Sequence, residues 1–221
     1  MSTVAAPGAA APAPSTTLGA LAPAGASMAA GTAPLSTASV TPARKLKVAT
    51  VSLAGCFGCH TSFLDMDLRL LELIEHIEFD RSPLTDIKTI GRCDIGLIEG
   101  GLYNSENVRV LRDFRLHCTT LVAMGACAIN GGLPAERNHF ALADLLGDVY
   151  QTRPGLKAGS QIPDDPELPL LLRQVRPLHA VVHIDHFLPG CPPSGDAFWF
   201  FLTELLAGRT PHLPPPLMHY D

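Results

Sequence analysis

The chain has 221 residues, 47% of them hydrophobic and only 17% charged, with a formal net charge of −5. This length suits one domain with a sizeable core, and so low a charged fraction favours much buried or subunit-covered surface. The negative charge and the lack of a Lys/Arg cluster in the sequence argue against nucleic acid and anionic membrane as partners. No apolar run is long enough to span a bilayer.

The first 44 residues are almost all Ala, Pro, Gly, Ser and Thr. They lack the bulky apolar side chains that offset the entropy of ordering a chain. We therefore predict a disordered extension over 1–44, followed by one domain over 45–221.

The rest of the chain alternates between continuous apolar strands and segments with helical spacing of apolar residues. In chain order we expect a strand over 45–55, a helix over 61–77, a strand over 93–101, a helix over 105–118 capped by Ser105, a strand over 119–128, helices over 138–150 and 166–175, a strand over 179–190 and a helix over 194–208. The buried face of the first helix should carry Phe63, Leu64, Leu68, Leu71, Ile74 and Ile77. This alternation predicts an α/β fold with a mainly parallel sheet and helices on both faces.

Six cysteines are distributed unevenly over these elements. Cys56 and Cys59 follow the first strand, Cys127 ends the strand at 119–128, and Cys191 ends the strand at 179–190. Ligands of parallel sheets gather at the carboxyl ends of the strands, so we expect these four cysteines to meet at one edge. The remaining two, Cys93 and Cys118, come at strand starts and should lie at the other edge.

Three kinds of site use converging cysteines. A strand, a C-x-x-C motif and a helix together match a thioredoxin-like redox pair, but this leaves Cys127 and Cys191 unexplained. A zinc ion usually joins two close pairs, whereas this chain has one pair and two separate cysteines. A [4Fe–4S] cluster takes four thiolates from distant loops and favours Gly-rich surroundings such as "GACAINGG" (125–132) and "PGCPPSG" (189–195).

Several other candidates have simpler interpretations. We expect Cys93 and Cys118 to be small buried hydrophobic residues. The spacing of His179, His183 and His186 is too loose to indicate a metal site, so surface or core roles are favoured. Glu99 follows directly on a buried strand, at the expected functional edge, where a structural hydrogen bond is favoured over a proton relay.

With these three cysteine motifs in this order, the chain resembles the small subunits of [NiFe] hydrogenases, and more closely those of the soluble NAD-reducing (Hox-type) subgroup. The segments "SFLDMDLRLL", "SPLTDIKTI" and "IEGGL" fit that subgroup, and the resemblance covers residues 45–221. It implies a flavodoxin-like fold. It also implies one proximal [4Fe–4S] cluster, and the motif positions assign its ligands to Cys56, Cys59, Cys127 and Cys191.

The resemblance also implies the partners. These are a large subunit that carries the Ni–Fe centre, and iron–sulfur and flavin subunits (the diaphorase) that reduce NAD. This chain would pass electrons between them during H2 oxidation or proton reduction, and would not be active alone. Part of the aromatic run Phe198–Phe201 is expected to meet a partner.

This chain departs from the family pattern at three points, and each changes what we expect of it. Only about 30 residues follow Cys191 and none is a cysteine, so we expect no second or third cluster. The twin-arginine signal of exported members is absent, so we expect a cytoplasmic protein. Many members have a Glu where this chain has Thr61, so its proton-relay role does not carry over.

Related proteins give alternatives. The complex I homologue shares the G-C-P-P loop but has adjacent cysteines in its first motif, whereas Phe57 and Gly58 separate Cys56 from Cys59 here. Small subunits of F420- or sulfur-linked hydrogenases are closer alternatives. FMN is compatible with a flavodoxin-like fold, but the loop that usually holds its phosphate carries Cys56 and Cys59, so we predict no tightly bound FMN there.

Overall fold

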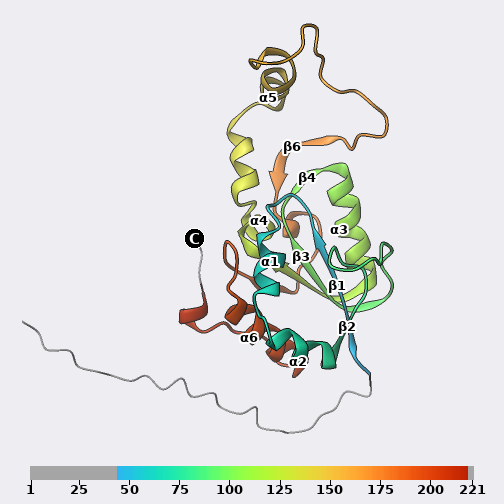
Figure 1. The fold of residues 1–221 in the computed structure, drawn as a ribbon, viewed down its shortest axis with the longest axis vertical. Helices are drawn as coiled ribbons and strands as arrows, with labels where there is room; N and C mark the ends of the chain where they lie inside the picture. The colour runs from blue at the N-terminus through green and yellow to red at the C-terminus, as the bar shows by residue number, and fades with distance from the viewer. Residues whose placement is uncertain (1–43, 219–221) are drawn as a thin grey trace, which may run out of the picture. The chain divides into compact units, whose positions relative to one another are not determined.

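A five-stranded parallel sheet forms the centre of the protein, which we describe from a computed structural model over residues 44–218 (Figure 1). The predicted extension over 1–44 lies outside the described residues except for Arg44. The spatial order of the strands is β2-β1-β3-β5-β7, and every pairing is parallel. This is the flavodoxin-like strand order, so the predicted α/β class is confirmed. The strands are β1 (Leu46–Ser52), β2 (Ile77–Phe79), β3 (Cys93–Glu99), β5 (Cys118–Met124) and β7 (His186–Leu188).

Helices cover both faces of this sheet, as the continuously apolar strands require. Figure 1 shows α3 on one side of the strands and α1, α2 and α6 on the other. Successive strand residues point to opposite faces, so Leu97 of β3 packs with Phe198 of α6 while Ile98 packs with Phe114 of α3. The helices are α1 (Gly58–Leu64), α2 (Arg69–His76), α3 (Ser105–His117), α4 (Gly125–Asn130) and α6 (Gly195–Leu206).

The segment between α4 and β7 is less regular. It contains a 3-10 helix η1 (Leu133–His139), a short helix α5 (Leu142–Gly147), a π turn η2 (Asp148–Thr152), β6 (Leu171–Arg176) and a 3-10 turn η3 (Leu178–Ala180). A last 3-10 turn, η4 (Pro215–Leu217), follows α6. Over the part of the chain that the structure describes, no helix has the length and apolar character to cross a membrane.

The helix predicted over 166–175 is wrong. Its second half is strand β6, which pairs antiparallel with β4 (Leu102–Asn104) in a separate two-stranded sheet. A short apolar run such as "LPLLL" does not distinguish helix from strand by its periodicity. The open edge of β4, far away in the sequence, decided it by offering backbone hydrogen-bond partners.

Two neighbouring predictions are correct only in part. The strand expected over 179–190 is confined to β7, because the chain first forms η3 and reaches the sheet edge late. The helix expected over 138–150 starts later and is divided between α5 and a π turn. β7 is an edge strand, and α5 and η2 contact mainly each other, so fewer tertiary contacts enforce a regular backbone in both segments.

The helix predicted over 61–77 is broken in two. Asp67 adopts a left-handed conformation (φ 54°), which ends one helix before α2 begins. The break rotates α2, so that Leu73 is buried while Leu68 and Leu71 are 73% and 61% exposed. The predicted apolar face is therefore wrong at Leu64, Leu68, Leu71 and Ile74 and correct at Phe63, while Ile77 is buried as predicted but begins strand β2.

The helices predicted over 105–118 and 194–208 are confirmed, with one change of cap. Asn104, not Ser105, caps α3: its side-chain oxygen accepts a hydrogen bond from the Asn107 N–H at 2.8 Å. The Ser105 hydroxyl instead accepts from the Leu170 N–H at 3.0 Å, next to β6. Ser194 caps α6 through the Ala197 N–H.

Truncating the core on the α6 face should destabilise the fold strongly. Phe198 is 0% exposed and packs edge-on against Phe63 with ring centroids 5.7 Å apart. Phe198→Ala should lower the free energy of unfolding by about 3–5 kcal/mol, measured by urea denaturation. Leu116→Ala, at a side chain 80% exposed, should change it by less than about 0.5 kcal/mol. Equal effects of the two substitutions would contradict this assignment of the core.

Candidate functional site

Four cysteines line one pocket at the carboxyl edge of the sheet: Cys56, Cys59, Cys127 and Cys191. The first two follow β1, Cys127 lies in the first turn of α4 after β5, and Cys191 follows β7. Parallel strands end at a common edge, so the topology alone brings these three loops together. Cys59 and Cys127 are half-buried, whereas Cys56 and Cys191 are exposed. The predicted convergence is therefore what the structure shows.

Backbone and side-chain hydrogen bonds tie the three loops to one another. The Ala126 N–H donates to the Gly190 carbonyl at 2.8 Å, joining the Cys127 loop to the Cys191 loop. The Ser62 hydroxyl donates to the Pro193 carbonyl at 2.5 Å, joining α1 to the Cys191 loop. Ala54 and Gly101 exchange two backbone bonds of 3.0 and 2.8 Å, which fix the Cys56 loop to the chain after β3. The positions of the cysteines are thus set by the scaffold.

Glycines leave room for the sulfur atoms. A Cβ at Gly125 would lie 2.4 Å from the Cys59 Sγ, and one at Gly132 would lie 2.8 Å from the Cys127 Sγ. Both glycines also have positive φ, 80° and 47°, which disfavours any other residue. A side chain at either position would fill space that the sulfurs occupy, so the pocket is shaped around its thiols.

The pocket disfavours the ionised form of its buried thiols. Burial raises the pKa of the Cys59 thiol well above its usual range, and the Glu99 carboxylate, Cys127 and Cys56 raise it further. Burial also raises the pKa of Cys127, with added contributions from Cys191 and Cys56. Four thiolates here therefore need a positively charged group between them, because binding to a metal compensates both the desolvation and the mutual repulsion.

The four sulfurs are not arranged around one point. Within residues 44–218, no group of three or more His, Cys, Asp or Glu side chains is placed to hold a single metal ion. A zinc site needs all its ligands around one atom at about 2.0–2.3 Å, whereas an iron–sulfur cluster takes one thiolate for each of several irons. The donor set of four thiols and the glycine-shaped space fit a cluster better than one ion.

Glu99 lies beneath this pocket and is 2% exposed. Its carboxylate accepts a hydrogen bond from the Ser52 hydroxyl at 2.5 Å and another from the His60 N–H at 3.1 Å. The His60 Nδ1 lies 3.3 Å from the same carboxylate. Because His60 follows Cys59 directly, Glu99 holds the backbone beside a site cysteine. The structural role favoured from the sequence thus has named partners.

The surroundings of the buried Glu99 carboxylate favour its ionised form. Burial raises the pKa of Glu99, but the hydrogen bonds from His60 and Ser52 and the close approach of the His60 imidazole outweigh it, and the net shift is downward. His60 in turn stacks on Phe57 with ring centroids 4.7 Å apart and meets the Thr50 hydroxyl at 2.9 Å. The sequence analysis left His60 unassigned and did not single out Ser52. The sequence signal that could have found this network was the pair of polar residues Thr50 and Ser52 at alternate positions of a buried strand.

Cys93 and Cys118 lie at the opposite edge, at the starts of β3 and β5, as expected. Both are buried, 2% and 4% exposed. They are not separate hydrophobic residues, however: they form a disulfide with Cα atoms 4.7 Å apart. The two residues are register partners on neighbouring strands, so the sheet itself brings them together. Strand register is not visible in the sequence, which is why the bond was missed.

The remaining candidates do not converge. His179 lies edge-on to Phe187, His183 lies 3.4 Å from Asp185, and His186 lies edge-on to Phe201. These contacts fit the surface and core roles expected for the three histidines. The Thr61 hydroxyl donates to the Phe57 carbonyl at 3.2 Å within its own helix and is exposed.

Comparison with known proteins identifies the family. Residues 56–205 match the family described as NADH ubiquinone oxidoreductase, 20 Kd subunit. The chain is 48% identical over 182 residues to the NAD-reducing hydrogenase HoxS subunit delta of Cupriavidus necator, covering 80% of this chain and 86% of that protein. It is 33% identical to a subunit of the F420-non-reducing hydrogenase of Methanococcus voltae, covering 80% of this chain but 61% of that protein.

A solved structure agrees with these relatives. A chain of the NAD+-reducing [NiFe]-hydrogenase in the H2-reduced state is 59% identical, with a TM-score of 0.79, and the match covers 80% of this chain and all of that one. Both sequence and fold thus lead to hydrogenase subunits. The chain belongs to the NADH ubiquinone oxidoreductase 20 kDa subunit family, as a small subunit of the [NiFe]-hydrogenase type.

Proposed function

We propose that this chain is the electron-transferring small subunit of an NAD-reducing [NiFe] hydrogenase. It relays electrons between the Ni–Fe site of a large subunit and the iron–sulfur and flavin subunits of a diaphorase. Cys56, Cys59, Cys127 and Cys191 hold one proximal [4Fe–4S] cluster, within a domain that spans 45–221. Because the proposed acceptor is NAD, we place the enzyme in the cytoplasm.

One observation carries the cluster proposal: four thiols from three loops line a single glycine-shaped pocket at the carboxyl edge of a parallel sheet. When bound, a [4Fe–4S] cluster supplies one-electron redox chemistry there. The 59% identity to a chain of an NAD+-reducing [NiFe]-hydrogenase supports the reaction assigned to the whole enzyme.

The residues of this chain set the environment of that site. The pocket places Cys56 and Cys191 at the surface, where partner subunits have access, and half-buries Cys59 and Cys127. The ionised Glu99 places negative charge beneath the thiols and orients the backbone of His60. Local charge and hydrogen bonding are the means by which a protein tunes such a centre.

The alternatives fit less well. A thioredoxin-like pair needs only Cys56 and Cys59, and it leaves Cys127 and Cys191, which line the same pocket, without a role. Phe57 and Gly58 between the first two cysteines argue against a complex I-like protein. Small subunits of F420- or sulfur-linked hydrogenases fit less well than the NAD-reducing type: the chain is 29% identical to a chain of the coenzyme F420 hydrogenase of Methanosarcina barkeri and 25% to one of a sulfhydrogenase of Pyrococcus furiosus, against 48% to HoxS subunit delta.

We expect the four proposed ligands to be equally necessary. Cys127→Ser and Cys191→Ser should each reduce iron and sulfide content as severely as Cys59→Ser, because one missing thiolate leaves one iron unligated. Cys93→Ala and Cys118→Ala should leave the content unchanged. The assays are iron, sulfide and EPR after anaerobic purification and reduction. A colourless protein that contains zinc, or only a reversible Cys56–Cys59 disulfide, would disprove the proposal.

The glycine cradle gives a second prediction. Gly125→Ala should reduce the iron content sharply, because its Cβ would lie 2.4 Å from the Cys59 Sγ. Gly155→Ala is the matched control: Gly155 has a similar φ of 90°, but an added Cβ meets nothing within 4 Å. Both substitutions impose the same kind of backbone strain and only the first obstructs a sulfur. Equal losses of iron would show that strain alone is responsible.

Flavin content is a third prediction. The loop after β1 carries the Cys56–Cys59 pair, so we expect no tightly bound FMN at that position. Denaturing the isolated two-subunit module of large and small subunits should release far less FMN than one molecule per module, measured by fluorescence. The reason is that the Cys56–Cys59 loop occupies the strand-end position that would otherwise hold the FMN phosphate. Stoichiometric FMN in this module would contradict the prediction.

A further inference from the structure

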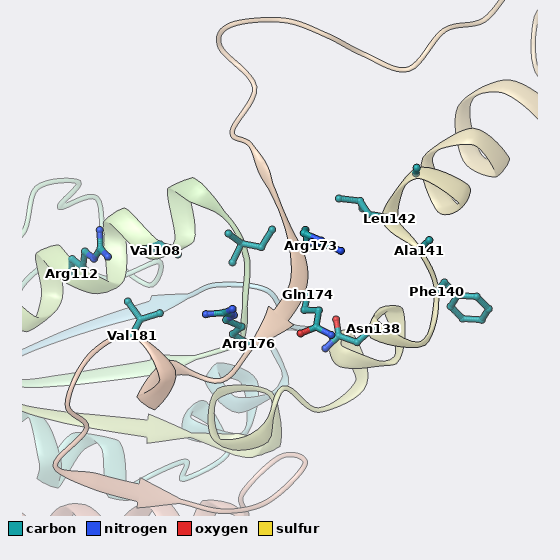
Figure 2. Close-up of a pocket in the computed structure, with 12 residues that line it drawn as sticks. Val108, Arg112, Asn138, Phe140, Ala141, Leu142, Arg173, Gln174, Arg176 and Val181 are labelled. Carbon is teal, nitrogen blue, oxygen red and sulfur yellow. The ribbon is translucent and has the colours of Figure 1, made fainter.

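A second cavity, of about 880 Å³, lies apart from the cysteine pocket. Figure 2 shows its walls: Arg112 comes from α3, Arg173 and Arg176 come from β6, and Phe140 comes from the connection between η1 and α5. The sequence analysis found no basic cluster, because Arg112 is far along the chain from Arg173 and Arg176. The pairing of β6 with β4 brings them together.

These three arginines lack partners, unlike most arginines of this chain. Arg69 and Arg115, for example, form ion pairs of 2.6 and 2.7 Å. Over residues 44–218, the arginines whose side chains form no hydrogen bond, ion pair or aromatic contact are Arg92, Arg112, Arg173 and Arg176. Three of these four line one cavity, and none of the residues found to line that cavity is acidic. Figure 2 shows Arg176 on the side of β6 that faces α3 and Arg112, and Arg173 on the other side, so the cavity carries positive charge on both sides of this strand. In a chain of net charge −5, this uncompensated positive charge indicates a negatively charged occupant.

The surroundings of these arginines are apolar. Val108, Leu172 and Val181 line the cavity and pack partly against the α3-side core. At its rim, Phe140 is 62% exposed. Exposed apolar side chains continue beyond the cavity, with Leu170 at 78%. A small molecule inside the cavity would leave these side chains in water, whereas a protein surface can cover them together with the arginines.

We propose that this cavity, the arginine groove, binds an acidic and partly apolar segment of another subunit of the hydrogenase. The inference rests on the proposed function, since it needs a multi-subunit enzyme. Carboxylates of the segment pair with Arg112, Arg173 and Arg176, and its apolar side chains cover Phe140 and Leu170. Pairing with carboxylates suits arginine, whose planar guanidinium donates two parallel hydrogen bonds.

Charge reversal in the intact enzyme tests the proposal. R173E/R176E, in the assembly purified through a tag on this chain, should weaken the retention of one partner subunit by at least about tenfold, because like charges then face each other. The wild-type association should also weaken with salt more steeply than that of the variant. R92E is the charge control, since the Arg92 side chain also forms no hydrogen bond or ion pair, lies outside the groove and acts only at longer range on Asp94. R173K/R176K, which keeps the charge, should retain the subunit.

Two further measurements separate charge from misfolding. R112E, on α3 rather than β6, should release the same subunit. Carbodiimide cross-linking of the R173K enzyme, followed by mass spectrometry, should join this position to an Asp or Glu of that subunit. Iron content, which reports on the proposed cluster, should stay unchanged in all these variants, so the two proposals fail independently.

Other outcomes overturn the proposal. Retention of every subunit by both R173E/R176E and R112E would exclude a role in assembly. Loss of a co-purifying phosphate-bearing small molecule, with the subunit content unchanged, would assign the groove to that ligand instead. Release of a subunit by R92E as well would show a general effect of net charge.

Discussion

The parallel pairing of β1, β3, β5 and β7 is the constraint on which the rest of the structure depends. It places the ends of β1, β5 and β7 at one edge, and these ends carry all four cysteines of the pocket. The same register sets Cys93 opposite Cys118 at the other edge. One hydrogen-bonded sheet therefore separates two kinds of cysteine, one group open to partners and the other bonded within the core.

The site also depends on the layers that cover the sheet. Alternate residues of β3 pack against α6 on one face and α3 on the other, which locks the strands in register. Glu99 ends this strand and reaches across to Ser52 and the backbone of His60. The core thus extends into the pocket through a buried carboxylate, which holds the start of α1 in place beside Cys59.

The segment between α4 and β7 carries a second candidate contact surface. Several of its apolar side chains, such as Phe140 and Leu170, are exposed, and the side chains of Arg173 and Arg176 at the groove lack partners on this chain. Alone in water this is an unfavourable surface, but in a multi-subunit enzyme it is ordinary interface. The low charged fraction of the chain fits the same proposal, and residues 1–43, which contain no Asp, Glu, Lys or Arg, lower it further.

The sequence by itself determined the α/β class, the helices over 105–118 and 194–208, and the edge at which four cysteines meet, because strand periodicity and motif order are local properties. Tertiary structure alone decided that 171–176 is a strand, that Leu68 and Leu71 face outward, and that Cys93 bonds to Cys118. It also decided that Arg112, Arg173 and Arg176 line one cavity. Each of these depends on which distant segment offers a backbone or side-chain partner, and that information is absent from any short stretch of sequence.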